Sequence, residues 1–552
     1  MRRKLKIILP SIFVLVVLTA AVKPATDRYF EILKNLDIFA TLFKEVNSHY
    51  VDEINPTTLM KSGIDQMLET LDPYTNYIAA DDIESYRIMT TGEYSGIGAV
   101  VERKNGVSTV IMPYEGFAAH DAGLRAGDEI HAINGISLEG KTQEEVRYLM
   151  QGQSNSDITL TIKRYGQNEM FDVQVKREKI AVDSVPYAGM VTDNIGYVRL
   201  TSFTPNVGRS IGIKVLDLIE EGAENIILDL RGNPGGLLHE AVNVSNVFLE
   251  KGRKIVTQKG KIRANDWTYN TLNDPVDSDI PLVVLTDNGS ASASEIVSGV
   301  VQDYDRGILV GRKTFGKGLV QIERPLSYDA VVKITTAKYY TPTGRCIQAI
   351  DYSNRNEDGS VGKIPDSLKN EFFTLNGRKV FDGGGIDPDV EVEALEFAPV
   401  TRSLLQNDLI FHYATDFFYK NESRDYDKPK DVQLSDADYS QFLNWLSDKE
   451  FDYETRVEKK TDELIRVAKS EKKYAALKDH FDKLQKASAH NKDEDLKTFK
   501  DEIMMLLEQE IAGRYFFERG VIEATFEEDP DVQEAIKILN DPARYQAILN
   551  PS

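Results

Sequence analysis

One short stretch decides the fold class: residues 225–236 read NIILDLRGNPGG. Its first six residues are mostly apolar without alternation, which is typical of a strand buried on both faces of a sheet. The glycines after it predict a tight turn, and residues 237–249 continue with helical spacing of apolar residues. A second unit has the same form, with a buried strand at 282–286 and a helix at 292–304. Strands that alternate with helices in this way predict a layered α/β core.

The residue pattern on either side of this core is different and indicates further domains. This is expected, because 552 residues are too many for one hydrophobic core. We place the core at residues 181–398, including a polar insertion at 351–380. Before it, residues 91–180 combine short strands, one helix and glycine turns, and residues 26–90 have helical spacing. After it, residues 399–552 are rich in charged residues and leucine. They predict a helical extension without catalytic residues, since charged helical faces are usually only solvated.

Residues 1–25 have the form of an export signal. The basic stretch MRRKLK precedes an apolar run from Ile7 to Val22, which is the order found in a signal peptide or an N-terminal membrane anchor. Positive charge before the run predicts that the rest of the chain lies outside the cytoplasm. We therefore expect a periplasmic or other extracytoplasmic protein, anchored to the inner membrane if this segment is not cleaved.

Composition excludes several classes of function. A net charge of -22 argues against a nucleic-acid partner, because phosphate binding needs a cationic surface. The single cysteine, Cys346, leaves no internal disulfide and no zinc site built on thiolates. The seven histidines contain no His-x-x-x-His pair, so we expect neither a zinc peptidase nor another metal site.

The second strand-to-helix junction carries the candidate nucleophiles. Residues 288–296 read NGSASASEI and offer Ser290, Ser292 and Ser294. Ligands collect at the carboxyl ends of strands in open α/β sheets, where free helix amides favour negative charge and suit a developing oxyanion. The alternative role is helix capping, with Glu295 closing a capping box from Ser292. The motif by itself leaves both roles open.

A serine nucleophile needs a base, and two residues compete for that role. His239 follows the first junction, but no acid is obviously placed to orient it. Lys317 lies in TFGKGLVQ, residues 314–321, between glycines and apolar neighbours. Burial would lower the pKa of this lysine toward neutrality, which a lysine base requires. The alternative for Lys317 is an ordinary surface lysine in a hairpin loop.

Taken together, three motifs resemble the carboxyl-terminal processing (tail-specific) serine protease family with a PDZ domain. They are DLRGNPGG at 229–236, GSASASEI at 289–296 and FGKGLVQ at 315–321, in this order behind the module at 91–180. The resemblance implies a crotonase-like α/β protease core with an inserted PDZ domain, a helical N-terminal domain and a helical C-terminal extension. It also implies a Ser–Lys catalytic dyad without a cofactor.

Carried over residue by residue, the resemblance makes Ser292 the nucleophile and Lys317 the general base. Gln321 would orient that lysine. The oxyanion hole would use the amide of Ala293 and one amide of the Gly235-Gly236 pair, between which we lean toward Gly236.

The loop at the start of the expected PDZ domain would bind the carboxylate of a substrate. Glycines free successive amides to form a nest for the terminal carboxylate, while the adjoining strand edge pairs with the peptide. The residues that match this loop are Gly96, Ile97, Gly98 and Ala99. One departure is Gln151, which stands where many relatives carry an arginine, so coupling of PDZ occupancy to activation through that arginine is in doubt.

The resemblance implies a serine endopeptidase that cleaves exported proteins near apolar, unstructured C-termini. Its partners would be protein or peptide substrates with free C-termini, and a homo-oligomer is compatible with the sequence. Two alternatives belong to other classes: a PDZ adaptor that binds tails without cutting, and a crotonase-like acyl-CoA enzyme. Intact Ser292, Lys317 and Gln321 argue against the first, and the lack of an obvious CoA supply outside the cytoplasm argues against the second.

Overall fold

The computed structural model describes residues 28–550 apart from 84–85, 88–90 and 357–358. The export signal expected at residues 1–25 lies outside the described residues. Within those residues, none of the helices combines the length and the hydropathy that crossing a membrane requires.

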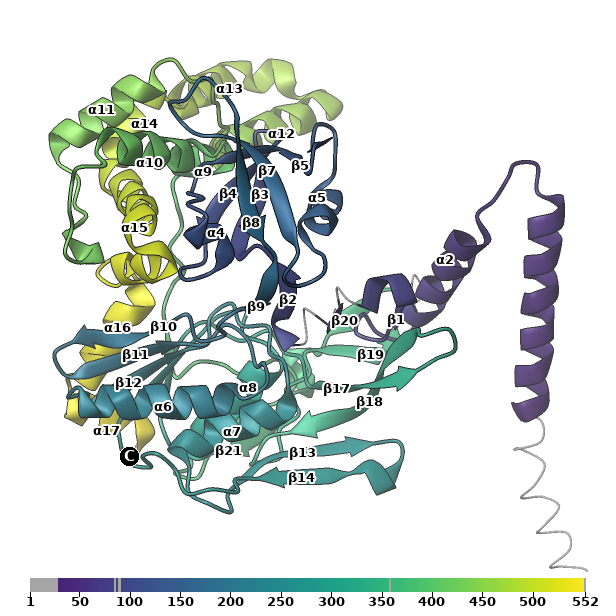
Figure 1. The fold of residues 1–552 in the computed structure, drawn as a ribbon. Helices are drawn as coiled ribbons and strands as arrows, with labels where there is room; N and C mark the ends of the chain where they lie inside the picture. Colours follow the sequence, from purple (N-terminus) through teal and green to yellow (C-terminus); the bar gives the residue numbers. More distant parts are fainter. Residues whose placement is uncertain (1–27, 84–85, 88–90, 357–358, 551–552) are drawn as a thin grey trace, which may run out of the picture.

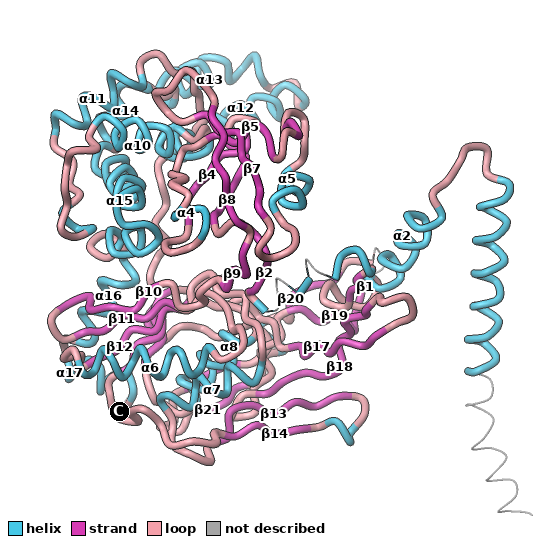
Figure 2. The backbone as a smooth tube through the Cα atoms, in the orientation of Figure 1, coloured by secondary structure: helices cyan, strands magenta, loops and turns pink. Residues whose placement is uncertain are grey.

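A six-stranded sheet lies in the lower body of the molecule as drawn in Figures 1 and 2, and it confirms the expected α/β core. Its first pair is antiparallel and all later pairs are parallel. In spatial order, its strands are β10 (Tyr187–Thr192), β11 (Ile195–Arg199), β12 (Asn225–Asp229), β15 (Leu282–Thr286), β16 (Ile308–Gly311) and β23 (Val390–Glu391).

Alternate residues of the central strands enter two separate hydrophobic cores. On β12, Ile226 and Leu228 face one core and Ile227 faces the other. The first core is completed by α6 (Val207–Glu220), α7 (Leu238–Phe248) and α8 (Ala293–Asp303). The second is completed by α16 (Pro530–Leu539) and α17 (Pro542–Leu549). The end of the C-terminal extension is therefore part of the protease core, which its charged, leucine-rich composition did not predict.

A second sheet lies beside the first and brings distant segments together. Strand β18 (Val331–Tyr340) pairs with β1 (Asn76–Ile78), with β13 (Lys254–Gly260) and with β17 (Leu319–Pro325), while β14 (Trp267–Asn270) pairs with β13. The register sets Asn76 opposite Lys333 and Gln321 opposite Thr335. The N-terminal region and the turn that carries Lys317 consequently meet on β18.

The polar insertion forms two short hairpins. The first pairs β19 (Ile350–Arg355) with β20 (Val361–Lys363), and the second pairs β21 (Glu371–Phe373) with β22 (Lys379–Phe381).

The expected PDZ module is a separate sheet joined to the core by two strands. Strands β2 (Glu93–Gly96) and β9 (Glu178–Ala181) pair with each other and form this connection. Strand β3 is at one edge of the module's sheet. The module contains β3 (Ala99–Lys104), β4 (Val107–Pro113), α4 (Ala118–Asp121), β5 (Glu129–Ile133), β6 (Ile136–Ser137), α5 (Gln143–Met150), β7 (Asp157–Lys163) and β8 (Phe171–Lys176).

The N-terminal region is helical, as expected. Residues 28–49 form one helix that extends away from the body in Figure 1, and α2 (Pro56–Glu69) follows it. Helix α2 ends at Glu69 with Thr70 as its C-cap, a few residues before Pro73. Asp72 then accepts hydrogen bonds from the amides of Tyr74 and Thr75, each 2.9 Å long, which directs the chain into β1.

The C-terminal region forms a helical domain that touches both other parts of the molecule. It has its own hydrophobic core, and Lys104 of the PDZ module pairs with Asp408 at 2.9 Å. The last helix of this domain leads down to α16 beneath the central sheet (Figure 1). Its helices are α9 (Pro399–Gln406), α10 (Leu409–Lys420), α11 (Asp436–Leu446), α12 (Arg456–Ser470), α13 (Tyr474–Ser488), α14 (Lys492–Thr498) and α15 (Lys500–Thr525).

Candidate active site

Ser292 lies at the junction between β15 and α8, where the backbone is strained. Its φ of 55° and ψ of -109° lie outside the regions that non-glycine residues favour. Such a conformation costs about 1–3 kcal/mol and persists only when the surrounding structure enforces it. Strain of this kind is typical of a nucleophile presented on a sharp strand-to-helix turn.

The two neighbouring serines have structural roles. The hydroxyl of Ser290 donates to the carbonyl of Leu230 at 2.8 Å, and the hydroxyl of Ser294 donates to the carbonyl of Asn233 at 2.9 Å. Both serines are fully buried, whereas Ser292 is only half-buried. Of the three candidates, Ser292 is therefore the one that a substrate can reach.

Lys317 lies half-buried between Gly316 and Gly318. Its Nζ lies 4.4 Å from the centre of the Tyr74 ring, and it forms no ion pair within the described part of the chain. Its pKa falls to about 8, mainly because burial removes water from the ammonium group and also because Lys333 repels it. The carboxylates of Glu295 and Asp72 act in the opposite direction.

The competing base, His239, has a different environment. It lies on α7 with 62% of its side chain exposed, and its Nε2 is 3.5 Å from Glu240 Oε1. No hydrogen bond joins His239 to Ser292 among the described residues. An exposed, loosely held imidazole is a poor candidate for a base that must be oriented within hydrogen-bond reach of the nucleophile.

The two side chains of the expected dyad are not joined in this conformation. Across residues 28–550 as described, no hydrogen bond joins Ser292 Oγ to Lys317 Nζ. Gln321 donates to Thr335 Oγ1 at 3.2 Å, and that hydroxyl donates to Asp72 Oδ1 at 3.2 Å. In this conformation Gln321 therefore binds Thr335 and not Lys317. Catalytic hydrogen bonds often tighten only when substrate binds, so the orientation of Lys317 by Gln321 stays a prediction.

The two glycines proposed for the oxyanion hole differ in the use of their amides. Gly235 donates its N–H to Asn233 Oδ1 at 2.9 Å, while the N–H of Gly236 has no partner among the described residues. Ala293 is the first residue of α8, a position whose amide has no partner within the helix. A Cβ at Gly235, whose φ is +103°, would lie 2.9 Å from the Cβ of Ser292. The geometry thus favours Gly236 with Ala293 as donors and gives Gly235 a space-making role.

The loop expected to bind a carboxylate has the required backbone shape. Gly98 has a φ of +76°, and its carbonyl accepts the N–H of Tyr114 at 2.9 Å. The side chain of Ile97 is buried, and its carbonyl accepts the N–H of Ala119 at 2.8 Å. With both carbonyls turned into the module, this stretch resembles an amide nest that leads directly into the edge strand β3.

The free edge of β3 already carries an internal contact. Gln143, the first residue of α5, donates from Nε2 to the carbonyl of Val101 at 2.6 Å. A peptide that pairs with β3 needs this edge, so Gln143 competes with it. The sequence did not identify this residue.

An arginine does reach the end of α5, although not from the expected position. Gln151 is the C-cap residue of this helix, and Arg177 donates to the carbonyls of Leu149 and Met150 at 2.8 Å each. Arg177 immediately precedes β9, one of the two strands that connect the PDZ module to the core.

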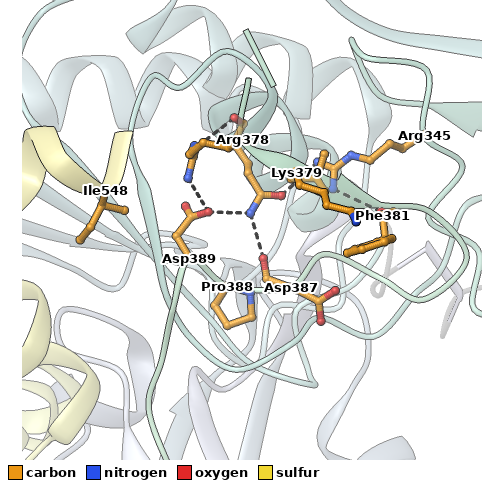
Figure 3. Close-up of a pocket in the computed structure, with 10 residues that line it drawn as sticks. Arg345, Arg378, Lys379, Phe381, Asp387, Pro388, Asp389 and Ile548 are labelled. Atoms are coloured by element: carbon orange, nitrogen blue, oxygen red, sulfur yellow. Dashed lines mark hydrogen bonds and ion pairs between the residues drawn. The ribbon is translucent and has the colours of Figure 1, made fainter. Parts of the chain in front are cut away.

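A separate pocket of about 430 Å³ lies on the core near the C-terminal helices (Figure 3). Its charged groups are paired: Arg378 contacts Asp305 and Asp389 at 2.6 Å each, and Arg345 contacts Asp303. Because these charged groups already pair with one another, they do not favour the binding of a charged ligand. Elsewhere in the described ranges, no cluster of three or more His, Cys, Asp or Glu side chains could hold a metal ion.

Comparison with known proteins identifies the family of this chain. The family model for peptidase family S41 matches residues 194–354. A carboxy-terminal-processing protease of Bartonella bacilliformis is 36% identical over 321 residues, which cover 57% of this chain and 73% of the relative. The chain belongs to peptidase family S41. It is a serine protease of the carboxy-terminal-processing kind.

Two further matches cover the other regions of this S41 protease. A PDZ domain model matches residues 110–164, and a model described as the C-terminal helical domain of a probable PDZ-protease matches residues 400–539. These matches confirm the PDZ domain and the helical C-terminal region.

Other relatives have similar names. A probable CtpA-like serine protease of Staphylococcus aureus is 37% identical over 316 residues, or 57% of this chain and 62% of that protein. Among solved structures, a photosystem II D1 C-terminal processing protease is 26% identical, with a TM-score of 0.35. That match covers 64% of this chain and 92% of the other.

Proposed function

We propose that this S41 protease hydrolyses peptide bonds near apolar, unstructured C-termini, with Ser292 as nucleophile and Lys317 as general base. The observation that carries the proposal is the environment of Lys317. A normal lysine, with a pKa near 10.4, is almost wholly protonated at neutral pH and cannot accept a proton. At a pKa of about 8, an appreciable fraction of Lys317 is neutral under the same conditions.

In the acylation step, Ser292 Oγ attacks the carbonyl carbon of the scissile bond and passes its proton to Lys317 Nζ. The negative charge on the carbonyl oxygen is stabilised by the amides of Ala293 and Gly236. The carbon–nitrogen bond then breaks, and Lys317 returns the proton to the departing amine. The N-terminal part of the substrate remains bound to Ser292 as an ester.

Deacylation repeats these steps with water. Lys317 takes a proton from the water as its oxygen attacks the ester, and returns the proton to Ser292 Oγ as the ester bond breaks. The same amides stabilise the second oxyanion. No step needs a cofactor.

Alignment of the dyad on substrate binding is part of the proposal. The amine lies against the ring of Tyr74, and a rotation about its flexible side chain would bring it toward Ser292. Gln321 would support the lysine in that position through the polar contacts around Thr335.

The PDZ domain would select substrates by their free C-terminal carboxylate. This role is supported by the loop at Gly96, Ile97, Gly98 and Ala99 and by the edge position of β3. An extended tail that adds to β3 gains main-chain hydrogen bonds while its carboxylate occupies the amide nest.

The location of the protein is also a proposal and rests on the sequence alone. The basic residues and apolar run of residues 1–25 favour export, followed by cleavage or retention as an inner-membrane anchor. Its substrates would then be exported proteins.

Three variants test the dyad on an unstructured peptide with an apolar tail. Ser292→Ala and Lys317→Ala should each lower kcat by at least about 10³-fold, and the double variant should be no worse, because residues that act as one unit are not additive. His239→Ala should keep most of the activity. A serine-reactive phosphonate should label the wild type at Ser292, which distinguishes a protease from a PDZ adaptor. The assignment is wrong if Lys317→Ala cleaves normally while His239→Ala is inactive.

A further inference from the structure

Two buried side chains, Glu295 on α8 and Tyr339 on β18, each contact the backbone of both proposed catalytic residues. Glu295 is fully buried, and Tyr339 is 1% exposed. Neither has an assigned part in the reaction as described so far. Their contacts join the nucleophile segment to the turn that carries the base.

The contacts of Glu295 converge on a single carboxylate. Its Oε2 accepts the N–H of Ser292 at 2.9 Å and the N–H of Lys317 at 2.8 Å. Its Oε1 accepts the hydroxyl of Thr314 at 2.6 Å and the N–H of Gly316 at 2.8 Å. All four partners are donors, so the carboxyl group has no acceptor for a proton of its own. Burial raises the pKa of the Glu295 carboxyl group, and these hydrogen bonds offset part of that effect.

Whereas Glu295 accepts hydrogen bonds from backbone N–H groups, Tyr339 donates to backbone carbonyl groups. Its hydroxyl lies 3.1 Å from the carbonyl oxygen of Ser292 and 2.7 Å from that of Lys317, and donates its single proton to these two acceptors. The ring packs in the hydrophobic core beneath the sheet. The N–H groups of both residues therefore meet one carboxylate oxygen, and their carbonyls meet one hydroxyl.

A capping box explains only part of this arrangement. Glu295 is the third residue of α8, where a glutamate commonly accepts the amide of the cap residue, here Ser292. Capping requires no contact with Thr314, Gly316 or Lys317. Three of the four hydrogen bonds to Glu295 thus serve the segment that carries the base, and Tyr339 is not part of the cap.

We infer that Glu295 and Tyr339 are positioning residues that hold the backbone of Ser292 and Lys317 at the separation the reaction needs. This inference rests on the proposed dyad. Rigid backbones leave only the lysine side chain to move when substrate binds. Small errors in the distance between reacting groups are expensive, since a displacement of 1 Å can lower a rate by about 10²-fold.

Glu295 also acts on the protonation of Lys317. The groups that face the ammonium are Lys333, which lowers its pKa, Asp72 and Glu295, which raise it, and the ring of Tyr74. The carboxylate of Glu295 itself is faced by Tyr339 and Tyr74, and the pKa of both phenols is raised in part by it. Loss of the negative charge at Glu295 should therefore lower the pKa of Lys317 further.

The test compares two variants of the full-length protein with two matched controls. The variants are Glu295→Gln and Tyr339→Phe. The controls are Glu240→Gln, another buried glutamate that accepts two backbone amides, and Tyr340→Phe, the neighbouring tyrosine. For each protein, kcat and KM for the unstructured peptide are measured against pH, together with Tm.

Tyr339→Phe should lower kcat by about 10-fold or more, with KM nearly unchanged and the pH profile in place, because no charge is lost. Glu295→Gln should lower kcat by about 10²-fold, and the acid limb of its pH profile should move to lower pH. Both controls should keep kcat within about 2-fold, whatever their effect on Tm.

Folded Glu295→Gln and Tyr339→Phe proteins with wild-type kcat would overturn the inference. So would a loss of Tm in Glu295→Gln without any movement of the acid limb, because it would show a purely structural cap. If Glu295→Gln does not fold, Tyr339→Phe still decides the positioning role. Failure of the proposed dyad is recognised separately, by activity in Ser292→Ala or Lys317→Ala.

Discussion

Three serines spaced two residues apart have different roles because their hydroxyl groups meet different surroundings. Ser290 and Ser294 satisfy carbonyls inside the core, and Ser292 lies at the strained start of α8 with a backbone held by Glu295. A buried hydroxyl that donates to a carbonyl is already satisfied and cannot be approached. The strained backbone is therefore found at the one of these three serines that is not fully buried.

At the same scale, replacement of Lys317 by arginine should abolish cleavage. Arginine keeps the positive charge and most of the reach, but guanidinium does not lose its proton in the accessible pH range. Wild-type activity should rise with pH as Lys317 deprotonates near a pKa of about 8, and fall on acidification. Gln321→Ala should reduce the rate without eliminating it. Cleavage rates of the wild type, Lys317→Arg and Gln321→Ala, measured from pH 6 to pH 10, check these expectations. Near-wild-type turnover by Lys317→Arg would mean that the proton acceptor lies elsewhere.

The same lysine should reduce the stability of the fold. Its pKa is lowered from 10.5 to about 8 in the folded state, so folding disfavours its protonated form. This destabilisation is fully present below pH 8 and disappears as the pH rises toward 10.5. Lys317→Met should consequently raise the free energy of unfolding by about 3 kcal/mol at pH 7, on the basis of 1.36 kcal/mol per pKa unit. Urea unfolding at pH 7 and at pH 10 measures the gain, and an equal gain at both pH values would contradict this origin.

At the scale of single elements, the edge strand β3 is the feature on which substrate selection depends. The carbonyl of Val101 on this edge is occupied by Gln143 of α5, which a bound peptide would have to displace. The register and strand order leave β3 unpaired on that side among the described strands. The element is thus poised to accept one more strand, with a side chain of the module in competition.

Gln143→Ala should therefore strengthen the binding of tail peptides. Release from a hydrogen bond worth about 0.5–1.5 kcal/mol corresponds to roughly 2- to 10-fold in Kd. Fluorescence anisotropy with a labelled peptide on the Ser292→Ala protein measures binding without cleavage. Gln174→Ala is the matched control, because that glutamine makes one side-chain hydrogen bond on the opposite edge strand, β8. Weaker binding in Gln143→Ala would show that Gln143 contacts the peptide instead of competing with it.

The same assay tests the carboxylate-binding loop. A peptide with an amidated C-terminus should bind more weakly than the free acid, and equal affinities would exclude recognition of the carboxylate by this loop.

At the scale of the whole molecule, the C-terminal region connects the PDZ module with the protease core. Its helical domain contacts the PDZ module through Asp408 and Lys104, and its last helices cover one face of the protease sheet. Asp531 at the start of α16 is buried and pairs with Arg231 at 2.8 Å and with Arg312 at 2.9 Å. Arg231 belongs to the loop that also carries Gly235 and Gly236, so the far end of the chain supports the proposed oxyanion hole.

Asp531→Ala should lower the free energy of unfolding by about 2–4 kcal/mol, because it leaves largely buried arginines short of a partner. It should also lower kcat through the loop of Arg231. The control is Asp366→Ala, which breaks an ion pair between Lys369 and an exposed carboxylate and should change the free energy of unfolding far less. Denaturant unfolding of both variants gives the comparison. Equal unfolding midpoints would show that α16 does not support the core through this contact.

The sequence by itself determined the class of fold and the kind of enzyme. Buried strands without alternation and glycine turns are local signals, so the α/β core, the short-stranded module and the helical ends could all be read from residue spacing. The proposed dyad was not read from spacing, which left Ser292 between helix capping and catalysis and Lys317 between a base and a surface lysine. It came from the resemblance of the three motifs to a protease family. Such a motif can be recognised in the sequence because residues that are adjacent in the chain are also adjacent in space.

Only the tertiary structure decided which side chains surround those motifs. Tyr74 reaches Lys317 because β1 pairs with β18, and Tyr339 reaches Ser292 from the other end of the same strand. The helices α16 and α17 cover a sheet that precedes them by hundreds of residues. The apolar or charged pattern of a segment records that it will be buried or solvated, but not against which partner. That choice depends on packing between elements far apart in the chain, which no local spacing encodes.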